Sequence, residues 1–313
     1  MKLALCTDVL AELSFVQMLD RVKQYGISGV EMTAGGWSPC PHVATDELLA
    51  SPSKLAAFRG ELEKRDMRIV ALNCSGNPLA PGALGEKHTT SSYKTLELAG
   101  KLGVKKIVMM SGLPGGCAED KIPNWITSTV SWPDYMPGVI DYQWNQVAIP
   151  WWQNFARHAA EHGVEQIALE EFPSQLVYNP STLLRLRQAV GGIIGMNLDP
   201  SHLIAMGADP IAAVRKLEGV IYHVHGKDAR IERGLAEVDG LLEYKPVTDT
   251  KNRTWNYVAV GCGQDLQWWK TFISVLRMTG YNGDVSLEME DLTMSVEAGL
   301  RTSIDALNAS LSQ

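Results

Sequence analysis

Short apolar runs alternate with amphipathic stretches along the whole chain. Several of the apolar runs are hydrophobic throughout, which is typical of parallel strands covered on both faces. They predict strands at Leu3–Cys6, Gly29–Met32, Arg68–Asn73, Lys106–Met110, Gln166–Glu170, Ile193–Leu198, Val220–Val224 and Asp284–Glu288. The amphipathic stretches predict helices at Ser14–Tyr25, Ser53–Arg65, Ser91–Leu102, Ile149–His162, Ser181–Ala189, Asp209–Leu217, Leu266–Thr279 and Met294–Leu311.

Eight strand–helix alternations of this spacing predict an α/β fold, a single-domain (β/α)8 TIM barrel over residues 1–313. The alternative is a doubly wound open sheet, which usually carries a glycine-rich nucleotide-binding turn after its first strand. Here that turn reads Thr7-Asp8-Val9-Leu10 and has no glycine. The pattern therefore favours the barrel.

Two connections are too long to be simple turns: Ser111–Val147 after the fourth strand and Ala229–Cys262 after the seventh. Both follow strand C-termini, which form the catalytic face of a barrel, so we expect lids or substrate walls. Oligomer contacts are the alternative. The aromatic residues in these loops could stack on a sugar or aglycone, or anchor an oligomer; they are Trp125, Trp132, Tyr135, Tyr142, Trp144, Trp255 and Tyr257.

Polar residues close four consecutive strands, and strand C-termini converge on one point in a barrel. The fifth to eighth strands end in Glu170-Glu171, Asp199-Pro200-Ser201-His202, His223-Val224-His225-Gly226-Lys227-Asp228 and Glu288-Met289-Glu290-Asp291. Any one of these could be a helix cap or an ion-pair partner. Three carboxylates in one cleft repel one another unless a cation is present, so their coincidence with an imidazole favours a divalent metal site.

Charge and cysteine content indicate which classes of partner and which cellular compartment to expect. The formal net charge is -7, and an acidic surface argues against a nucleic-acid partner. The five cysteines are odd in number and lack a CxxC pair, which is typical of reduced thiols, so we expect a cytoplasmic protein. The first apolar run is too brief for a signal peptide, and no apolar run is long enough to span a membrane.

Several motifs resemble the sugar phosphate isomerase/epimerase group of the xylose-isomerase-like TIM barrels. They are Asp199–His202, His223–Asp228, Gly280–Gly283 with Leu287–Asp291, Asn73–Leu79, Ser111–Gly116 and Val177–Pro180. The resemblance spans nearly the whole chain and includes ketose 3-epimerases and the catalytic subunits of C-glycoside deglycosidases. Two positions depart from it: Phe172 stands where many relatives carry a histidine, and Arg230 lies one position short of an arginine of the epimerases, so its role stays open.

The resemblance implies one divalent metal held by Glu170, Asp199, His225 and Glu288, with Mn²⁺ as the first choice and Mg²⁺, Co²⁺ or Zn²⁺ as alternatives. It also implies that Glu170 and Glu288 act as an acid/base pair and that His202 contacts substrate oxygens without binding metal. We expect Lys227 or Asp228 to orient His225 or a substrate hydroxyl. The remaining expected substrate contacts are Glu290 and Asn73.

The function we expect is a divalent-metal-dependent sugar isomerase or epimerase that removes a proton next to a carbonyl and passes through an enediolate. The alternative is a lyase that eliminates the aglycone from a 3-keto-glycoside, as in the deglycosidases, which work with a small second subunit. The partners would be a small carbohydrate substrate and either a homo-oligomer or such a subunit. An apurinic endonuclease would need more zinc-binding histidines and a basic DNA-binding face, and a chain with seven histidines and a net negative charge argues against it. The complete set of metal ligands argues against a non-catalytic sugar-binding protein.

Overall fold

Eight parallel strands form a closed barrel in the computed structural model, which describes residues 1–127 and 136–312. The strand order is β1-β10-β7-β6-β5-β4-β3-β2, which confirms the predicted barrel. The strands are β1 (Lys2–Cys6), β2 (Gly29–Thr33), β3 (Arg68–Asn73), β4 (Lys106–Met110), β5 (Gln166–Glu170), β6 (Ile194–Leu198), β7 (Ile221–Gly226) and β10 (Asp284–Leu287). Trp132 and Tyr135, two of the loop aromatics, lie outside the described residues.

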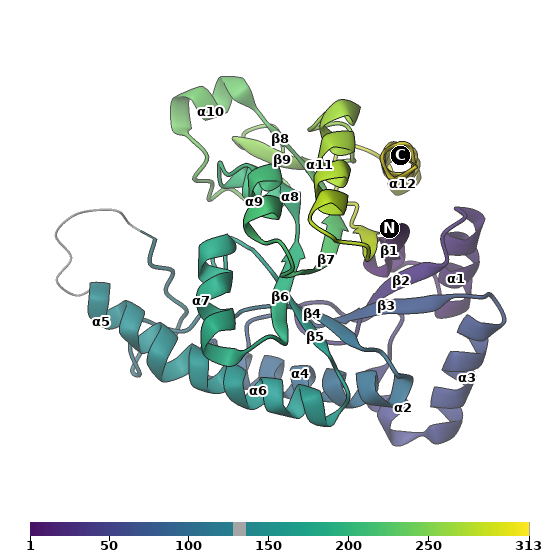
Figure 1. Ribbon diagram of the computed structural model, residues 1–313, viewed down its shortest axis with the longest axis horizontal. Coiled ribbons are helices and arrows are strands. Elements are labelled where there is room, and N and C mark those ends of the chain that lie inside the picture. Colours follow the sequence, from purple (N-terminus) through teal and green to yellow (C-terminus); the bar gives the residue numbers. More distant parts are fainter. Residues whose placement is uncertain (128–135, 313) are drawn as a thin grey trace. The chain divides into compact units, whose positions relative to one another are not determined.

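Helices alternate with these strands, as labelled in Figure 1. They are α1 (Phe15–Gln24), α2 (Thr45–Ala50), α3 (Pro52–Glu63), α4 (Ala83–Leu102), α5 (Met136–Asp141), α6 (Ile149–Glu161), α7 (Pro180–Val190), α8 (Pro200–Ala205), α9 (Pro210–Lys216), α10 (Arg233–Asp239), α11 (Leu266–Met278) and α12 (Val296–Leu311), with a 3-10 turn, η1 (Thr7–Leu10), and a π-helical segment, η2 (Tyr142–Ala148). None of the helices in the described part of the chain is long and apolar enough to cross a membrane.

The connection after β7 contains structure that the hydrophobic pattern did not predict. β8 (Asp228–Ile231) and β9 (Trp255–Val258) pair antiparallel, from Asp228 opposite Val258 to Ile231 opposite Trp255. Both strands have four residues, and Asp228–Ile231 carries two charged residues, so neither strand forms the apolar run that marked the barrel strands. This connection is therefore a folded hairpin with α10 between its strands rather than an irregular loop (Figure 1).

The chain divides into two compact units, each described by itself. The first unit is Met1–Glu31, Leu62–Val70 and Met196–Gln313, and the second is Met32–Glu61 and Ala71–Gly195. The fully buried core of the first includes Leu5, Leu19, Trp269 and Phe272. The fully buried core of the second includes Leu72, Ile107, Trp152 and Phe155.

Strand pairing in the first unit sets the ends of β6, β7 and β10 next to one another. β10 pairs with β7, so that Ser286 lies opposite His225, and β7 pairs with β6 through Val224 and Leu198. Asp199 follows β6 directly and Glu288 follows β10 directly. Three of the predicted ligands are thereby brought to neighbouring strand ends by backbone hydrogen bonding alone.

Candidate metal centre

Asp199, His225 and Glu288 converge in the first unit and are called the candidate metal centre below. His225 Nδ1 lies 3.2 Å from Glu288 Oε2 and 3.7 Å from Asp199 Oδ2. Each of the three residues offers a ligand atom within 4.8 Å of the others. Two carboxylates and one imidazole, without a thiolate, are donors that suit Mn²⁺, Mg²⁺, Co²⁺ or Zn²⁺. The residues therefore fit the cation that the sequence predicts.

Glu170, the fourth predicted ligand, belongs to the second unit. It is the last residue of β5, pairs with Met110 on β4 and is 3% exposed. Glu171, which follows it, is fully buried. The assignment of Glu170 to the metal stays a prediction.

Asp199 serves as a helix cap and faces the candidate metal centre at the same time. Its Oδ1 accepts hydrogen bonds from Ser201 N at 2.8 Å and Ser201 Oγ at 2.7 Å, which fixes the start of α8. Its Oδ2 lies 3.2 Å from His202 Nε2. Burial raises the pKa of Asp199, but the neighbouring His202, His225 and Lys227 outweigh burial and hold the pKa well below its ordinary value.

Glu31 holds the far side of the His225 ring and was not predicted from the sequence. His225 Nε2 lies 3.2 Å from Glu31 Oε1, and His223 Nε2 lies 2.7 Å from Glu31 Oε2. A proton on Nε2 that is donated to Glu31 leaves the Nδ1 lone pair directed at Asp199 and Glu288, as metal-binding histidines require. Although burial lowers the pKa of His225, the charges of Glu31, Cys6 and Glu288 raise it well above its ordinary value.

Lys227 contacts the carboxylates of Glu288 and Glu290, two residues that follow β10. Its Nζ lies 3.0 Å from Glu288 Oε2 and 2.8 Å from Glu290 Oε2, and it stands 4.5 Å from the centroid of the Tyr257 ring. Burial raises the pKa of Glu288, yet Lys227 and His225 together lower it to about 2. Lys227 therefore steadies Glu288, whereas the sequence analysis expected it to orient His225 or a substrate hydroxyl.

Asp228 binds backbone groups in the structure, and the prediction that it or Lys227 orients His225 or a substrate hydroxyl stays a prediction. The Asp228 carboxylate is buried and fully engaged in fastening the loop after β9 to β8. It accepts hydrogen bonds from the backbone N–H groups of Ala229, Gly261, Gly263 and Gln264 and from Trp269 Nε1. Gly263 is needed there, because a Cβ would lie 2.6 Å from Asp228 Oδ1 and 2.3 Å from the Ala229 carbonyl oxygen.

His202 lies beside the candidate metal centre. Its Nε2 faces Asp199 Oδ2, and its Nδ1 lies 3.1 Å from the hydroxyl of Tyr257. The ring is fully buried. Tyr257 therefore fixes His202, a role that the sequence did not indicate when it placed this tyrosine among stacking or oligomer-contact aromatics.

The second unit places an apolar cavity of about 410 Å³ beside the ends of β4 and β5. Trp37, Met110, Leu113, Trp125 and Phe172 are among the residues that line it. Phe172, which stands where many relatives carry a histidine, therefore lines an apolar cavity.

Two other residues of the second unit that the sequence analysis named are buried in the structure, and the substrate contact of Asn73 stays a prediction. Asn73, an expected substrate contact, is 9% exposed, and its Oδ1 accepts a hydrogen bond from Ser75 N. Trp144 is buried, with the Arg185 guanidinium 4.2 Å from its ring centroid. It is a core residue and does not present an oligomer anchor.

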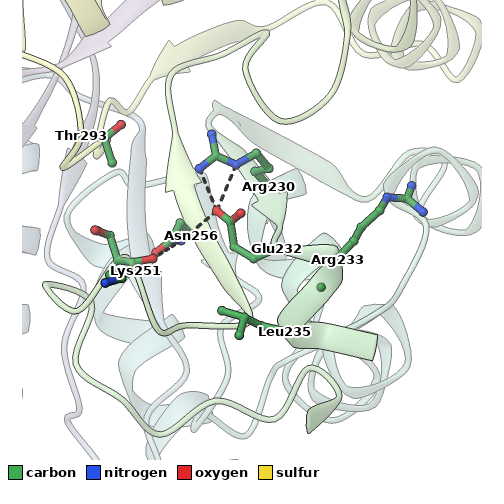
Figure 2. A pocket seen from close by; sticks show the side chains of 9 residues that line it. Arg230, Glu232, Arg233, Leu235, Lys251, Asn256 and Thr293 are labelled. Atoms are coloured by element: carbon green, nitrogen blue, oxygen red, sulfur yellow. Dashed lines mark hydrogen bonds and ion pairs between the residues drawn. The ribbon is translucent and has the colours of Figure 1, made fainter. Parts of the chain in front are cut away.

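Arg230, whose role the sequence left open, binds a carboxylate in a separate cavity of the first unit. Figure 2 shows this cavity, of about 540 Å³, between α10 and the β8–β9 hairpin. Arg230 Nε and Nη2 lie 3.0 and 2.7 Å from Glu232 Oε1, and Asn256 Nδ2 lies 3.0 Å from the same oxygen. None of the predicted metal ligands lines this cavity.

Comparisons with known proteins agree with the motifs. The profile of a family described as "Xylose isomerase-like TIM barrel" matches residues 19–310. The chain is 62% identical to the "Uncharacterized protein YfiH" of Bacillus subtilis (strain 168), over 100% of both chains.

Solved structures under 25% identical show the same fold. A structure of IOLI protein with a binding zinc atom has 18% identity and a TM-score of 0.66 over 100% of this chain and 98% of that one. D-psicose 3-epimerase in the presence of D-fructose has 12% identity and a TM-score of 0.63 over 100% of both chains. The probable 3-DHS dehydratase AsbF from Bacillus anthracis has 18% identity and a TM-score of 0.64 over 100% and 98%.

Proposed function

Because this chain belongs to the xylose isomerase-like TIM barrel family, we propose that it is a divalent-metal-dependent sugar isomerase or epimerase. The reaction would remove a proton from the carbon next to the carbonyl of a keto sugar. One observation carries the proposal: His225 presents Nδ1 to Asp199 and Glu288 while Glu31 holds Nε2. That arrangement orients an imidazole for metal binding and serves no evident packing purpose.

We assign the metal to Asp199, His225 and Glu288, with Glu170 as the fourth ligand and Mn²⁺ as the first choice of cation. When bound, the cation supplies a Lewis acid that stabilises the negative charge left on the substrate by proton loss. The neighbouring oxygen atoms of a keto sugar are the groups that such a site recognises.

The proton itself is carried by the chain's own carboxylates. We propose that one of Glu170 and Glu288 takes the proton from the substrate carbon through a carboxylate oxygen. Delivery of a solvent-derived proton by the other carboxylate to the opposite face would give an epimer, the first carboxylate releasing its proton to solvent; delivery of the abstracted proton to the neighbouring carbon would give an isomer. Lys227 contacts both Glu288 and Glu290, so it can keep a carboxylate partner at Glu290 while Glu288 holds the proton.

His202 is proposed as the donor to the substrate oxygen that becomes negative. Its Nε2 lies beside Asp199 Oδ2 and its Nδ1 lies beside the Tyr257 hydroxyl, so the ring is held with Nε2 toward the metal side. A buried donor that is already oriented costs no reorganisation during the reaction.

The alternative function, β-elimination from a 3-keto-glycoside, is favoured by the cavity of about 410 Å³ in the second unit. Trp37, Trp125 and Phe172 give it aromatic walls, which suit a flat or apolar aglycone better than a bare sugar. The same proton abstraction would then expel the aglycone from the next carbon.

Solvent exchange tests the proposal. Metal-stripped and Mn²⁺-loaded protein would be incubated in heavy water with a panel of ketohexoses and 3-keto-glycosides, followed by NMR and mass spectrometry. We expect deuterium next to the carbonyl only in the loaded protein, with loss of exchange in Glu288→Gln and retention in Glu232→Gln, a control on the separate cavity. Release of aglycone would favour elimination, and turnover without solvent label would contradict both functions.

A further inference from the structure

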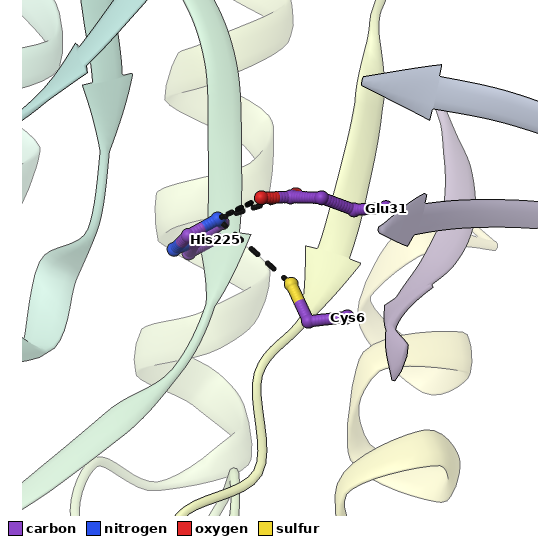
Figure 3. Close-up of side chains that lie close together, drawn as sticks. All are labelled: Cys6, Glu31 and His225. Atoms are coloured by element: carbon purple, nitrogen blue, oxygen red, sulfur yellow. Dashed lines mark hydrogen bonds and ion pairs between the residues drawn. The ribbon is translucent and has the colours of Figure 1, made fainter. Parts of the chain in front are cut away.

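Cys6, Glu31 and His225 form a second cluster of side chains that offer metal-ligand atoms (Figure 3). His225 faces this cluster through Nε2, whereas its Nδ1 faces Asp199 and Glu288. Cys6 is the last residue of β1 and lies opposite Glu31 in the parallel β1–β2 pair. The pairing places thiol and carboxylate side by side at one level of the sheet. His225 Nε2 lies 3.9 Å from Cys6 Sγ and 3.2 Å from Glu31 Oε1.

These separations are close to those of a tetrahedral zinc site. With Zn–S of about 2.3 Å and Zn–N and Zn–O of about 2.0 Å, tetrahedral angles place S and N about 3.5 Å apart and N and O about 3.3 Å apart. All three ligand atoms lie within 4.8 Å of one another. Glu31 Oε2 lies 2.7 Å from His223 Nε2, a contact that anchors the carboxylate beside the His225 ring.

We propose that Cys6 Sγ, Glu31 Oε1 and His225 Nε2 bind a thiophilic cation, Zn²⁺ or Cd²⁺, at a second site, the thiolate site. The candidate metal centre offers only oxygen and nitrogen, so the thiolate distinguishes the two sites chemically. Coordination displaces the proton of the Cys6 thiol and the proton on Nε2, both of which leave to solvent. With both sites loaded, His225 bridges the two cations through its two nitrogens.

The two sites are expected to prefer different cations, because their ligand atoms differ in hardness. Mn²⁺ and Mg²⁺ prefer oxygen ligands and should load the candidate metal centre alone, whereas Zn²⁺ and Cd²⁺ should load both. A zinc-loaded protein would then hold His225 from both sides and differ from the manganese-loaded protein in stoichiometry as well as in the identity of its metal.

Cadmium is the probe, because a cadmium–thiolate bond absorbs in the near ultraviolet. Metal-stripped protein would be titrated with Cd²⁺ while absorbance is recorded, and bound metal counted after desalting. We expect two equivalents and a thiolate band in the wild type, and one equivalent without the band in Cys6→Ser. Cys262→Ser, which removes another partly exposed thiol, should behave as wild type. Asp199→Ala should lose one equivalent and keep the band, which separates this proposal from the proposed function.

A thiolate band retained in Cys6→Ser, or a wild type that binds Cd²⁺ without any band, would overturn the proposal. Circular dichroism would check that each variant is folded. Should Cys6→Ser fail to fold, Glu31→Gln keeps the thiol and must raise the Kd for the band-forming cation by about tenfold or more. An unchanged Kd in that variant would also contradict the thiolate site.

Discussion

The two nitrogens of His225 face different carboxylates, and this division governs how the ring can bind a cation. Nδ1 faces Asp199 and Glu288, whereas Nε2 faces Glu31. Partners that hold the second nitrogen of a metal-binding histidine set the tautomer and the direction of the ring. Metal binding by His225 is therefore expected to depend on Glu31 as well as on the other ligands.

Glu31→Ala should weaken Mn²⁺ binding by about 10–100-fold, the usual effect of removing a residue that orients a ligand. The mutation removes the acceptor of the Nε2 proton, so the ring can turn Nδ1 away from the metal. Calorimetric titration of metal-stripped protein measures the change, and Glu232→Ala is the matched control. An affinity equal to wild type would show that Glu31 does not orient His225.

Lys227→Met should change the acid dependence of stability in the metal-free protein. The pKa of Glu288 is lowered from 4.5 to about 2, chiefly by Lys227 and His225 against burial. A lowered carboxyl pKa stabilises the folded state above the unfolded value of 4.5, and this stabilisation disappears as the pH falls toward 2. The lysine's share is at most on the order of 3 kcal/mol.

Urea unfolding of both proteins between pH 7 and about pH 2 tests this. We expect the wild type to be the more stable protein at neutral pH and the two free energies of unfolding to converge as the pH falls below the ordinary glutamate range. A constant difference across the series would mean that Lys227 contributes by packing alone.

The ligand residues could be predicted because each lies at the C-terminal end of a strand or directly after it, and strand ends share one edge of a barrel. Glu31 could not, because it stands as one charge within the short run Gly29–Met32, and its partners lie on β7, far away in sequence. Lys227 was recognised as a site residue, but nothing in the sequence says which carboxylate a lysine will contact.

Among the elements, the β8–β9 hairpin is fastened to the turn after β9 by the Asp228 carboxylate. One carboxylate accepts hydrogen bonds from both sides of the connection and from the Trp269 indole. The sequence suggested an ion pair or a site residue at Asp228, since the motif His223–Asp228 places it next to chemistry. Its backbone partners come from the turn after β9, and no residue pattern reveals hydrogen bonds to backbone groups.

Asp228→Ala should destabilise the protein by about 2–4 kcal/mol, because buried N–H groups lose their acceptor. Metal content should stay at the wild-type level, since the carboxylate contacts no metal-ligand side chain. Thermal and urea unfolding measure the first effect, elemental analysis measures the second, and Asp305→Asn on the exposed face of α12 is the control. Loss of metal with unchanged stability would restore Asp228 to the site.

On the scale of the whole molecule, the pattern of apolar residues was enough to predict the eight strands of the barrel. Three strands, Arg68–Asn73, Lys106–Met110 and Gln166–Glu170, have the predicted bounds, and the other barrel strands differ by one or two residues at an end. The short helices and strands within the two long connections were not predicted, because they show no clear pattern of apolar residues. We propose that residues 1–313 act as one domain.

Manganese binding to metal-stripped protein tests the central claim most directly. Free Mn²⁺ would be followed by electron paramagnetic resonance during titration of the wild type, of alanine variants at Glu170, Asp199, His225 and Glu288, and of Glu232→Ala. The account predicts one equivalent in the wild type and the control, and strongly weakened binding in each of the four ligand variants. A wild type that binds no manganese, or four variants that bind it as the wild type does, would contradict the account.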